Sequence, residues 1–236
     1  MGCCIPKEAD TEVLTTLPSS SPEEESAIHL QEQALLYGQQ KAGRLWEEIE
    51  KVTEQGRVTP SHFFAFAGQL GLNMKGIDED QTPMKTFYRK FRDGNRFDAG
   101  KLKVLAVLLG QGDPGTKAAL LFDTFQKGNS MGVEEIQSML DSILSISADF
   151  LPLLAVQQTG LTEKSYIQLS LFLGSQKDPV RDRMCNLILE LHRQVSKEQL
   201  VSRFQQDEVL QRLCSPHKVR RLLESEAVSL TPPIAH

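Results

Sequence analysis

The sequence predicts an all-α protein, and three observations support this prediction. Apolar residues recur at helical spacing along most of the chain, helix-start pairs such as Ser21-Pro22 and Asp113-Pro114 precede several of these segments, and a helix–loop–helix pattern repeats. With 236 residues, 40% of them hydrophobic, the chain is long enough to bury a large core. A net charge of −5 without a concentrated basic face argues against nucleic acid as a partner.

The repeat is clearest within residues 91–147. An apolar residue is followed by five mostly polar or small residues that include glycine, a second apolar residue, four further residues and a third apolar residue. Searching for the same spacing finds four copies, which start at Val52, Phe91, Phe125 and Ala155. Intervals of roughly 30–40 residues are typical of tandem supersecondary units. We therefore predict four helix–loop–helix units within residues 22–177.

This order of elements resembles the EF-hand superfamily, in which two helices flank a calcium-binding loop. The functional loop has twelve residues, and calcium takes six to eight oxygen ligands. Measured between the same apolar anchors, each loop of this chain is two residues shorter. These loops are Thr53–His62, Arg92–Lys101, Gln126–Glu135 and Val156–Ser165. None of them begins with Asp, and only Glu135 keeps the final carboxylate, so we predict loops that serve structure, without metal or cofactor.

Two narrower resemblances suggest alternatives. From Phe97 to about Val195 the order of features is similar to the degenerate EF-hand region of the dystrophin and dystrobrevin family, including Gly112 to Lys117 leading to Leu121-Phe122. Tyr166–Leu173 would then take the place of the final outgoing helix. An acylated N-terminus ahead of EF-hands resembles neuronal calcium sensors and calcineurin B, which keep working loops. These resemblances imply a cytoskeleton-linked adaptor or a calcium sensor.

The N-terminus carries candidate lipidation residues. Gly2 after the initiator methionine is an acceptor for myristate, and Cys3 and Cys4 beside it are candidates for palmitate. One myristoyl chain binds membranes only marginally, so the neighbouring thiols would supply the second anchor. We predict residues 1–21 as an acylated flexible tail, on the cytoplasmic face of a membrane, the plasma membrane first, and otherwise a cytoplasmic protein. No apolar run of 18 or more residues is found in the sequence.

The central helices are predicted to form the core. Leu102 to Leu109 is apolar on all sides, which is typical of a helix buried all round or of one that holds a partner. EF-hand pairs form an apolar groove that accepts an amphipathic helix. As groove candidates we take the large apolar side chains of this region: Phe91, Leu105, Leu109, Phe122 and Phe125.

One motif in this region has a second interpretation. Gly110 to Gly115 reads G-x-G-x-x-G, the spacing of a dinucleotide-binding turn between a strand and a helix. No further strand–helix alternation follows it. Asp113-Pro114 is an ordinary helix start, so we predict a helix over Pro114–Phe125.

The C-terminal part is predicted to be helical, with a new amphipathic helix starting after Asp178-Pro179. We place a separate helical segment at residues 178–224 and a flexible tail at 225–236. The basic cluster His217–Arg221 is interpreted first as solvated surface, with contact to anionic lipid or an acidic partner as the alternative. Cys185 and Cys214 lie in helical segments without zinc-type spacing, which favours a reducing compartment.

These features favour a non-catalytic, membrane-tethered adaptor that binds a protein partner, with an amphipathic helix as the expected ligand. The five histidines are scattered, and no nucleophile–base spacing or phosphate loop is recognisable, so we do not predict an enzyme. A calcium sensor with unconventional loops remains the first alternative. Its ligands would come from the acidic residues of the connections: Asp78, Glu79, Asp80 or Asp93.

Overall fold

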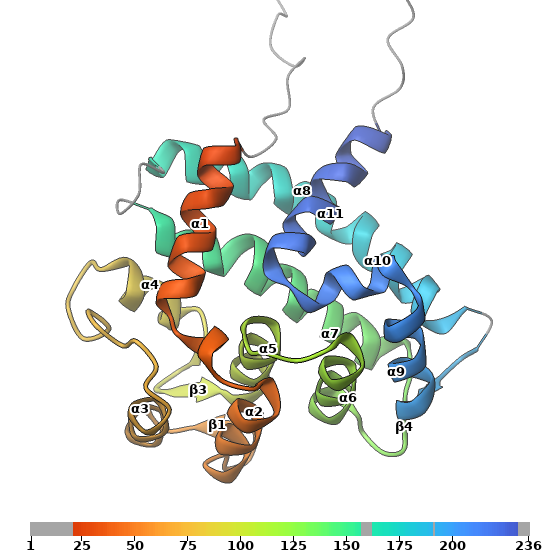
Figure 1. The fold of residues 1–236 in the computed structure, drawn as a ribbon, viewed down its shortest axis with the longest axis horizontal. Coiled ribbons are helices and arrows are strands. Elements are labelled where there is room, and N and C mark those ends of the chain that lie inside the picture. The colour runs from red at the N-terminus through yellow and green to blue at the C-terminus, as the bar shows by residue number, and fades with distance from the viewer. Residues whose placement is uncertain (1–20, 157–161, 191, 231–236) are drawn as a thin grey trace, which may run out of the picture.

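The structure, a computed structural model, describes residues 21–156, 162–190 and 192–230 (Figure 1). These residues form eleven α-helices, short 3-10 and π segments, and five strands of two or three residues each. The predicted all-α class is therefore confirmed. The strands are confined to the loops that join helices.

The N-terminal half runs from α1 to α5. Its elements in chain order are α1 (Pro22–Ala34), η1 (Tyr37–Gln39), α2 (Ala42–Lys51), β1 (Arg57–Val58), α3 (Pro60–Gln69), α4 (Pro83–Arg89), β2 (Arg92–Asp93), β3 (Arg96–Asp98) and α5 (Ala99–Leu109).

The C-terminal half runs from α6 to α11. Its elements are α6 (Pro114–Phe125), β4 (Ser130–Met131), α7 (Val133–Ser145), η2 (Ile146–Phe150), η3 (Leu151–Ala155), α8 (Glu163–Leu189), β5 (Val195–Ser196), α9 (Lys197–Gln206), α10 (Glu208–Gln211), η4 (Arg212–Cys214) and α11 (Pro216–Leu230). The predicted helix Pro114–Phe125 is confirmed as α6.

Short polar side chains start most of these helices. In α1, α3, α4 and α6 a Ser, Thr or Asp N-cap accepts a backbone N–H of the first turn and is followed by proline. Proline suits this position because its missing N–H would be unpaired there in any case. The predicted helix start at Ser21-Pro22 is confirmed, and capping boxes join Ser21 with Glu24 and Ser196 with Gln199.

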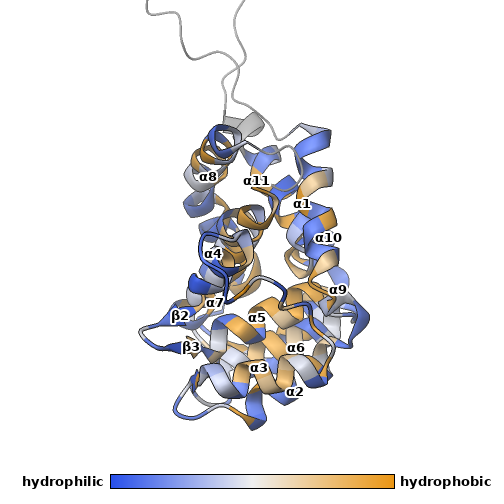
Figure 2. Ribbon diagram, turned by 90° about the vertical axis from the view of Figure 1, so that its left-hand side faces the viewer, coloured by the Kyte–Doolittle hydropathy of each residue, from blue (hydrophilic) through white to orange (hydrophobic). Residues whose placement is uncertain are grey.

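Helix α5 lies at the centre of the molecule, where it packs against α2, α6 and α7 (Figure 1). Residues 102–108 are all buried, so the prediction of a helix enclosed on every side is confirmed. Figure 2 shows the same concentration of hydrophobic residues in α5 and α6, whereas the β2–β3 hairpin is hydrophilic.

Gly110 explains why a glycine-rich pattern follows α5. A Cβ atom at this position would lie 2.6 Å from the Ala106 carbonyl oxygen and 2.8 Å from Ala42 Cα. Both neighbours are backbone atoms, so only glycine allows the end of α5 to approach the start of α2. The G-x-G-x-x-G spacing therefore serves helix packing, and the segment before it is helix α5 and not a strand.

Residues 133–155 form a continuous helical stretch made of α7, η2 and η3. By length and composition this stretch could cross a membrane, since an 18-residue window within it has a mean hydropathy of 1.4, but 61% of that window is buried inside the protein. Burial among other helices is the pattern of a core element.

Helix α8 corrects the predicted division of the C-terminal part. It continues through Pro179 without a break, so no new helix starts there and the predicted boundary at 177/178 falls inside one helix. A proline inside a helix costs about 3 kcal/mol. Burial of Leu169, Leu173, Val180 and Met184 on both sides of it offsets this cost, because α8 packs along α7 and α11.

The predicted flexible tail at 225–236 is also corrected, since α11 extends to Leu230. Residues 231–236 lie outside the described part of the chain. Within the described residues Cys185 and Cys214 are both buried and free.

Candidate functional site

The loops of the helix–loop–helix repeat meet in pairs. Strand β1 pairs antiparallel with β3, which places Val58 opposite Phe97, and β4 pairs antiparallel with β5, which places Met131 opposite Val195. Val58, Phe97 and Met131 are the central apolar residues of the first three predicted copies. The repeat found in the sequence therefore corresponds to a pairing of loops in space.

The fourth loop lies elsewhere than predicted. The third loop pairs with residues after α8, where Leu189, Val195 and Leu200 follow the same apolar spacing as the other copies. The predicted copy starting at Ala155 connects η3 to α8, and its residues 157–161 lie outside the described residues. Sequence reasoning missed this partner because Leu189, Val195 and Leu200 lie within residues 178–224, which were predicted as a separate helical segment.

Positively charged side chains stand beside the carboxylates of the first two loops. Arg57 Nη2 lies 2.5 Å from Asp93 Oδ2 and Arg96 Nη1 lies 3.9 Å from Glu54 Oε2, so both pairs join one loop to the other. The Arg92 guanidinium lies 5.1 Å from the centre of the Phe97 ring. Calcium sites instead have oxygens converging on one cation. Here the protein supplies the positive charge itself.

In the third loop, too, a positively charged side chain stands beside the carboxylate, here that of Glu135. Glu135 Oε2 accepts the Gly132 N–H at 3.0 Å, and Lys127 Nζ lies 3.3 Å from Glu135 Oε1. Hydrogen bonds from its own backbone N–H and from that of Gly132, with the charge of Lys127, hold the pKa of the Glu135 carboxyl below its usual value. Glu135 is thus a helix cap.

The acidic residues proposed for an unconventional calcium loop are dispersed. Asp80 Oδ1 accepts a hydrogen bond from Lys85 Nζ at 2.7 Å, while Asp93 pairs with Arg57. In the part of the chain that the structure describes, no group of three or more His, Cys, Asp or Glu side chains is placed to hold a metal ion.

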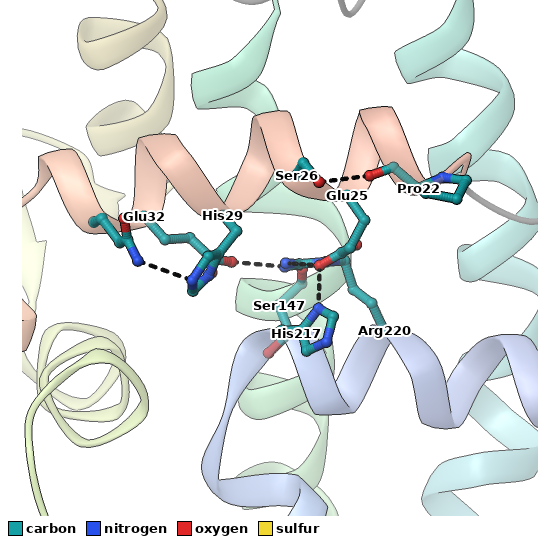
Figure 3. Close-up of polar contacts among 9 residues, drawn as sticks. Pro22, Glu25, Ser26, His29, Glu32, Ser147, His217 and Arg220 are labelled. Carbon is teal, nitrogen blue, oxygen red and sulfur yellow. Dashed lines mark hydrogen bonds and ion pairs between the residues drawn. The ribbon is translucent and has the colours of Figure 1, made fainter.

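A buried polar cluster joins the first helix to the last. Arg220 of α11 is fully buried, and its Nε and Nη2 donate to the carboxylate of Glu25 on α1 at 2.9 and 2.5 Å (Figure 3). Its Nη1 donates to Glu32 Oε1 at 2.8 Å and to the Ser147 carbonyl oxygen of η2 at 2.9 Å. One guanidinium therefore connects three elements that lie far apart in sequence.

Two histidines flank this cluster. His217 Nδ1 lies 2.8 Å from Glu25 Oε1, and His29 Nδ1 lies 3.4 Å from Glu32 Oε2. Burial by itself raises the pKa of Glu25, but the hydrogen bonds and charges of Arg220 and His217 outweigh it and hold that pKa below its usual value. A carboxyl with a lowered pKa stabilises the fold above its unfolded pKa. The contribution of Glu25 is thus complete at neutral pH and lost on acidification below about pH 4.5.

The cluster overturns the interpretation of residues 217–221 as solvated surface. Arg221 is exposed, but Arg220 is the largest fully buried side chain among the described residues. The sequence did carry a signal for this cluster, because the spacing of Glu25, Ile28 and Glu32 places all three on one face of a helix. In the structure all three are buried. Two carboxylates beside an apolar residue on a buried face require a cationic partner.

The predicted groove residues do not line an open surface. Phe91, Leu105 and Phe122 are buried in the core, and Leu109 and Phe125 are half-buried and packed against it. The prediction that the central helices form the core is confirmed, but the assignment of these five residues to a partner groove is wrong, because none of them is exposed. The protein's own helices fill the space in which a partner was expected.

The candidate lipidation residues Gly2, Cys3 and Cys4 lie outside the described residues. The described chain begins at Ser21, the N-cap of α1. Helix α1 therefore links any anchor at the N-terminus to the buried cluster.

In comparisons with protein-family models, curated proteins and solved structures, no match to this chain is found.

Proposed function

We propose that the protein is a non-catalytic, membrane-tethered adaptor built on a degenerate EF-hand scaffold. In this proposal α2–α3 pairs with α4–α5, and α6–α7 pairs with α8–α9, through strands β1–β3 and β4–β5. The observation that carries it is the combination of paired loops with arginine and lysine side chains beside the loop carboxylates.

The charge arrangement favours a scaffold over a sensor. An EF-hand sensor changes shape when calcium is coordinated by several carboxylates and other oxygens of its loop. Arg57 and Lys127 already pair with the carboxylates of Asp93 and Glu135. Exposed ion pairs of this kind contribute little stability, but the carboxylates of Asp93 and Glu135 are already compensated by positive charges of the protein.

Three side chains with potentially reactive groups, Cys185, Cys214 and Lys117, are buried. Burial raises the pKa of the Cys214 thiol to about 12 and also raises that of Cys185, which keeps both protonated and poorly nucleophilic. Burial lowers the pKa of Lys117, whose Nζ donates to the Leu108 and Cys214 carbonyl oxygens at 3.1 and 2.9 Å. These environments favour structural roles and support a non-catalytic protein.

The membrane tether is tested by changing the acyl acceptors. Gly2→Ala is expected to move most of the protein from the membrane fraction to the soluble fraction of expressing cells, because it removes the myristate acceptor. Cys3→Ser with Cys4→Ser is expected to weaken retention, since a single acyl chain binds only marginally. Metabolic labelling with a myristate analogue, followed by fractionation, measures both effects.

Gly43→Ala is the matched control for this test. It makes the same substitution in helix α2, where the added methyl group meets no atom within 4 Å. It should leave the distribution unchanged. If Gly2→Ala also leaves the membrane fraction unchanged and no label is incorporated, the proposed anchor is wrong.

A further inference from the structure

We infer that helix α1 is an intramolecular ligand, and that the surface beneath it docks an amphipathic helix of a partner protein. The partner helix would carry two carboxylates seven residues apart with an aliphatic residue between them, as Glu25, Ile28 and Glu32 do in α1. This inference rests on the proposed adaptor function and names the chemistry of its partner.

The first argument is the composition of the contact. Of the thirteen residues of α1, only four are buried: Glu25, Ala27, Ile28 and Glu32. Helices of this length are marginal in isolation. Half of the buried side chains of α1 are carboxylates, and its large side chain Leu30 points to solvent. The position of α1 against the rest of the protein therefore depends on its ion pairs with Arg220 as much as on apolar packing.

The second argument is the surface that α1 covers. It packs on η3, where Leu151, Leu154 and Ala155 are buried, and it lies beside α11, which supplies Arg220 (Figure 3). Removing α1 would leave an apolar strip bordered by a guanidinium that has lost both carboxylates and keeps only its hydrogen bond to the Ser147 carbonyl oxygen. A helix can occupy this surface only if it supplies carboxylates to Arg220, because a buried unpaired charge is strongly unfavourable. The same requirement rejects helices without such carboxylates.

The third argument is a pivot at the end of α1. Leu36 follows the helix with φ of 65°, a left-handed conformation that is unfavourable for a residue with a side chain. Beyond it, Tyr37 is fully buried, and its hydroxyl lies 3.3 Å from that of Tyr88. Asn73 donates its backbone N–H to the Leu35 carbonyl oxygen and its side chain to that of Ala34. The chain is therefore held in place at Ala34, Leu35 and Tyr37. The rest of α1, before these residues, is held against the protein by the Arg220 cluster.

The test uses the full-length chain carrying Gly2→Ala, so that membrane binding does not contribute, and a fluorescent peptide of residues 21–36. In the unaltered chain the tethered α1 acts at an effective concentration of about millimolar, so the added peptide should bind weakly. Glu25→Gln with Glu32→Gln in the protein removes the tethered carboxylates. We expect this variant to bind the peptide at least about tenfold more tightly.

The peptide provides its own matched control. Replacing Glu25 and Glu32 of the peptide by Gln should weaken its binding at least about tenfold, because Arg220 is left unpaired. Replacing Glu23 and Glu24 instead makes the same change of charge away from Arg220 and should have little effect. Equal binding of all three peptides would overturn the inference, since the contact would then be a general electrostatic or apolar one.

Two measurements keep the test decisive if the double variant folds poorly. Hydrogen exchange on the unaltered chain should show the α1 amides exchanging at least about tenfold faster than those of α5, and equal protection would show that α1 is a permanent part of the core. Sedimentation should find a monomer. A dimer that exchanges α1 between copies would make a second chain the occupant and would also overturn the inference. The fractionation of Gly2→Ala cells is independent of these outcomes, so either proposal can fail alone.

Discussion

Arg220→Met is expected to lower the free energy of unfolding by about 3–5 kcal/mol, the cost of leaving buried charges uncompensated. The substitution keeps most of the apolar stem but removes the guanidinium that neutralises the buried carboxylates of Glu25 and Glu32. Urea denaturation followed by far-UV circular dichroism measures the change.

Arg221→Met is the matched control for this prediction, because Arg221 is the neighbouring arginine and is exposed. Its replacement should change the free energy of unfolding by less than about 0.5 kcal/mol. Adding Glu25→Met and Glu32→Leu to Arg220→Met should recover most of the loss, since replacing a buried ionic cluster by apolar residues is often neutral. If Arg220→Met costs no more than Arg221→Met, the cluster does not hold α1 and α11 together.

Core truncations should have effects of similar size. Leu105→Ala and Phe122→Ala are expected to cost about 2–5 kcal/mol each, from lost apolar burial and from the cavity that remains. Leu105 is completely buried and Phe122 is 2% exposed. Leu171→Ala serves as the control, because Leu171 is 70% exposed, and it should cost less than about 0.5 kcal/mol. Comparable losses for Leu105 and Leu171 would contradict the packing described here.

The helical fold could be predicted from local sequence signals. The bounds of α6, the burial of α5 and the two capping boxes follow from N-cap chemistry, proline at the first helical position and apolar periodicity. These signals act within one or two helical turns, so they are visible in the sequence without knowledge of the tertiary contacts.

The features that were missed depend on contacts between distant residues. Pro179 is tolerated because α8 gains burial along its whole length. The apolar spacing of Leu189, Val195 and Leu200 is identified as a loop by the pairing of Val195 with Met131, because no glycine marks a loop between Leu189 and Val195. Arg220 lies among basic residues in a C-terminal helix, and only the tertiary fold brings it to Glu25 and Glu32. Local propensity carries no information about such partners.

The interpretation of the loops as structural is tested most directly by thermal unfolding with and without calcium. Calcium at millimolar concentration acting on a micromolar site would add about 4 kcal/mol to the free energy of unfolding and raise Tm by several degrees. We expect no calcium-dependent change, because Arg57 and Lys127 already neutralise the loop carboxylates. Glu135→Gln should also leave Tm nearly unchanged, since glutamine can still accept the Gly132 N–H. A rise of several degrees in calcium that Glu135→Gln abolishes would show that the third loop binds metal and that the protein is a sensor.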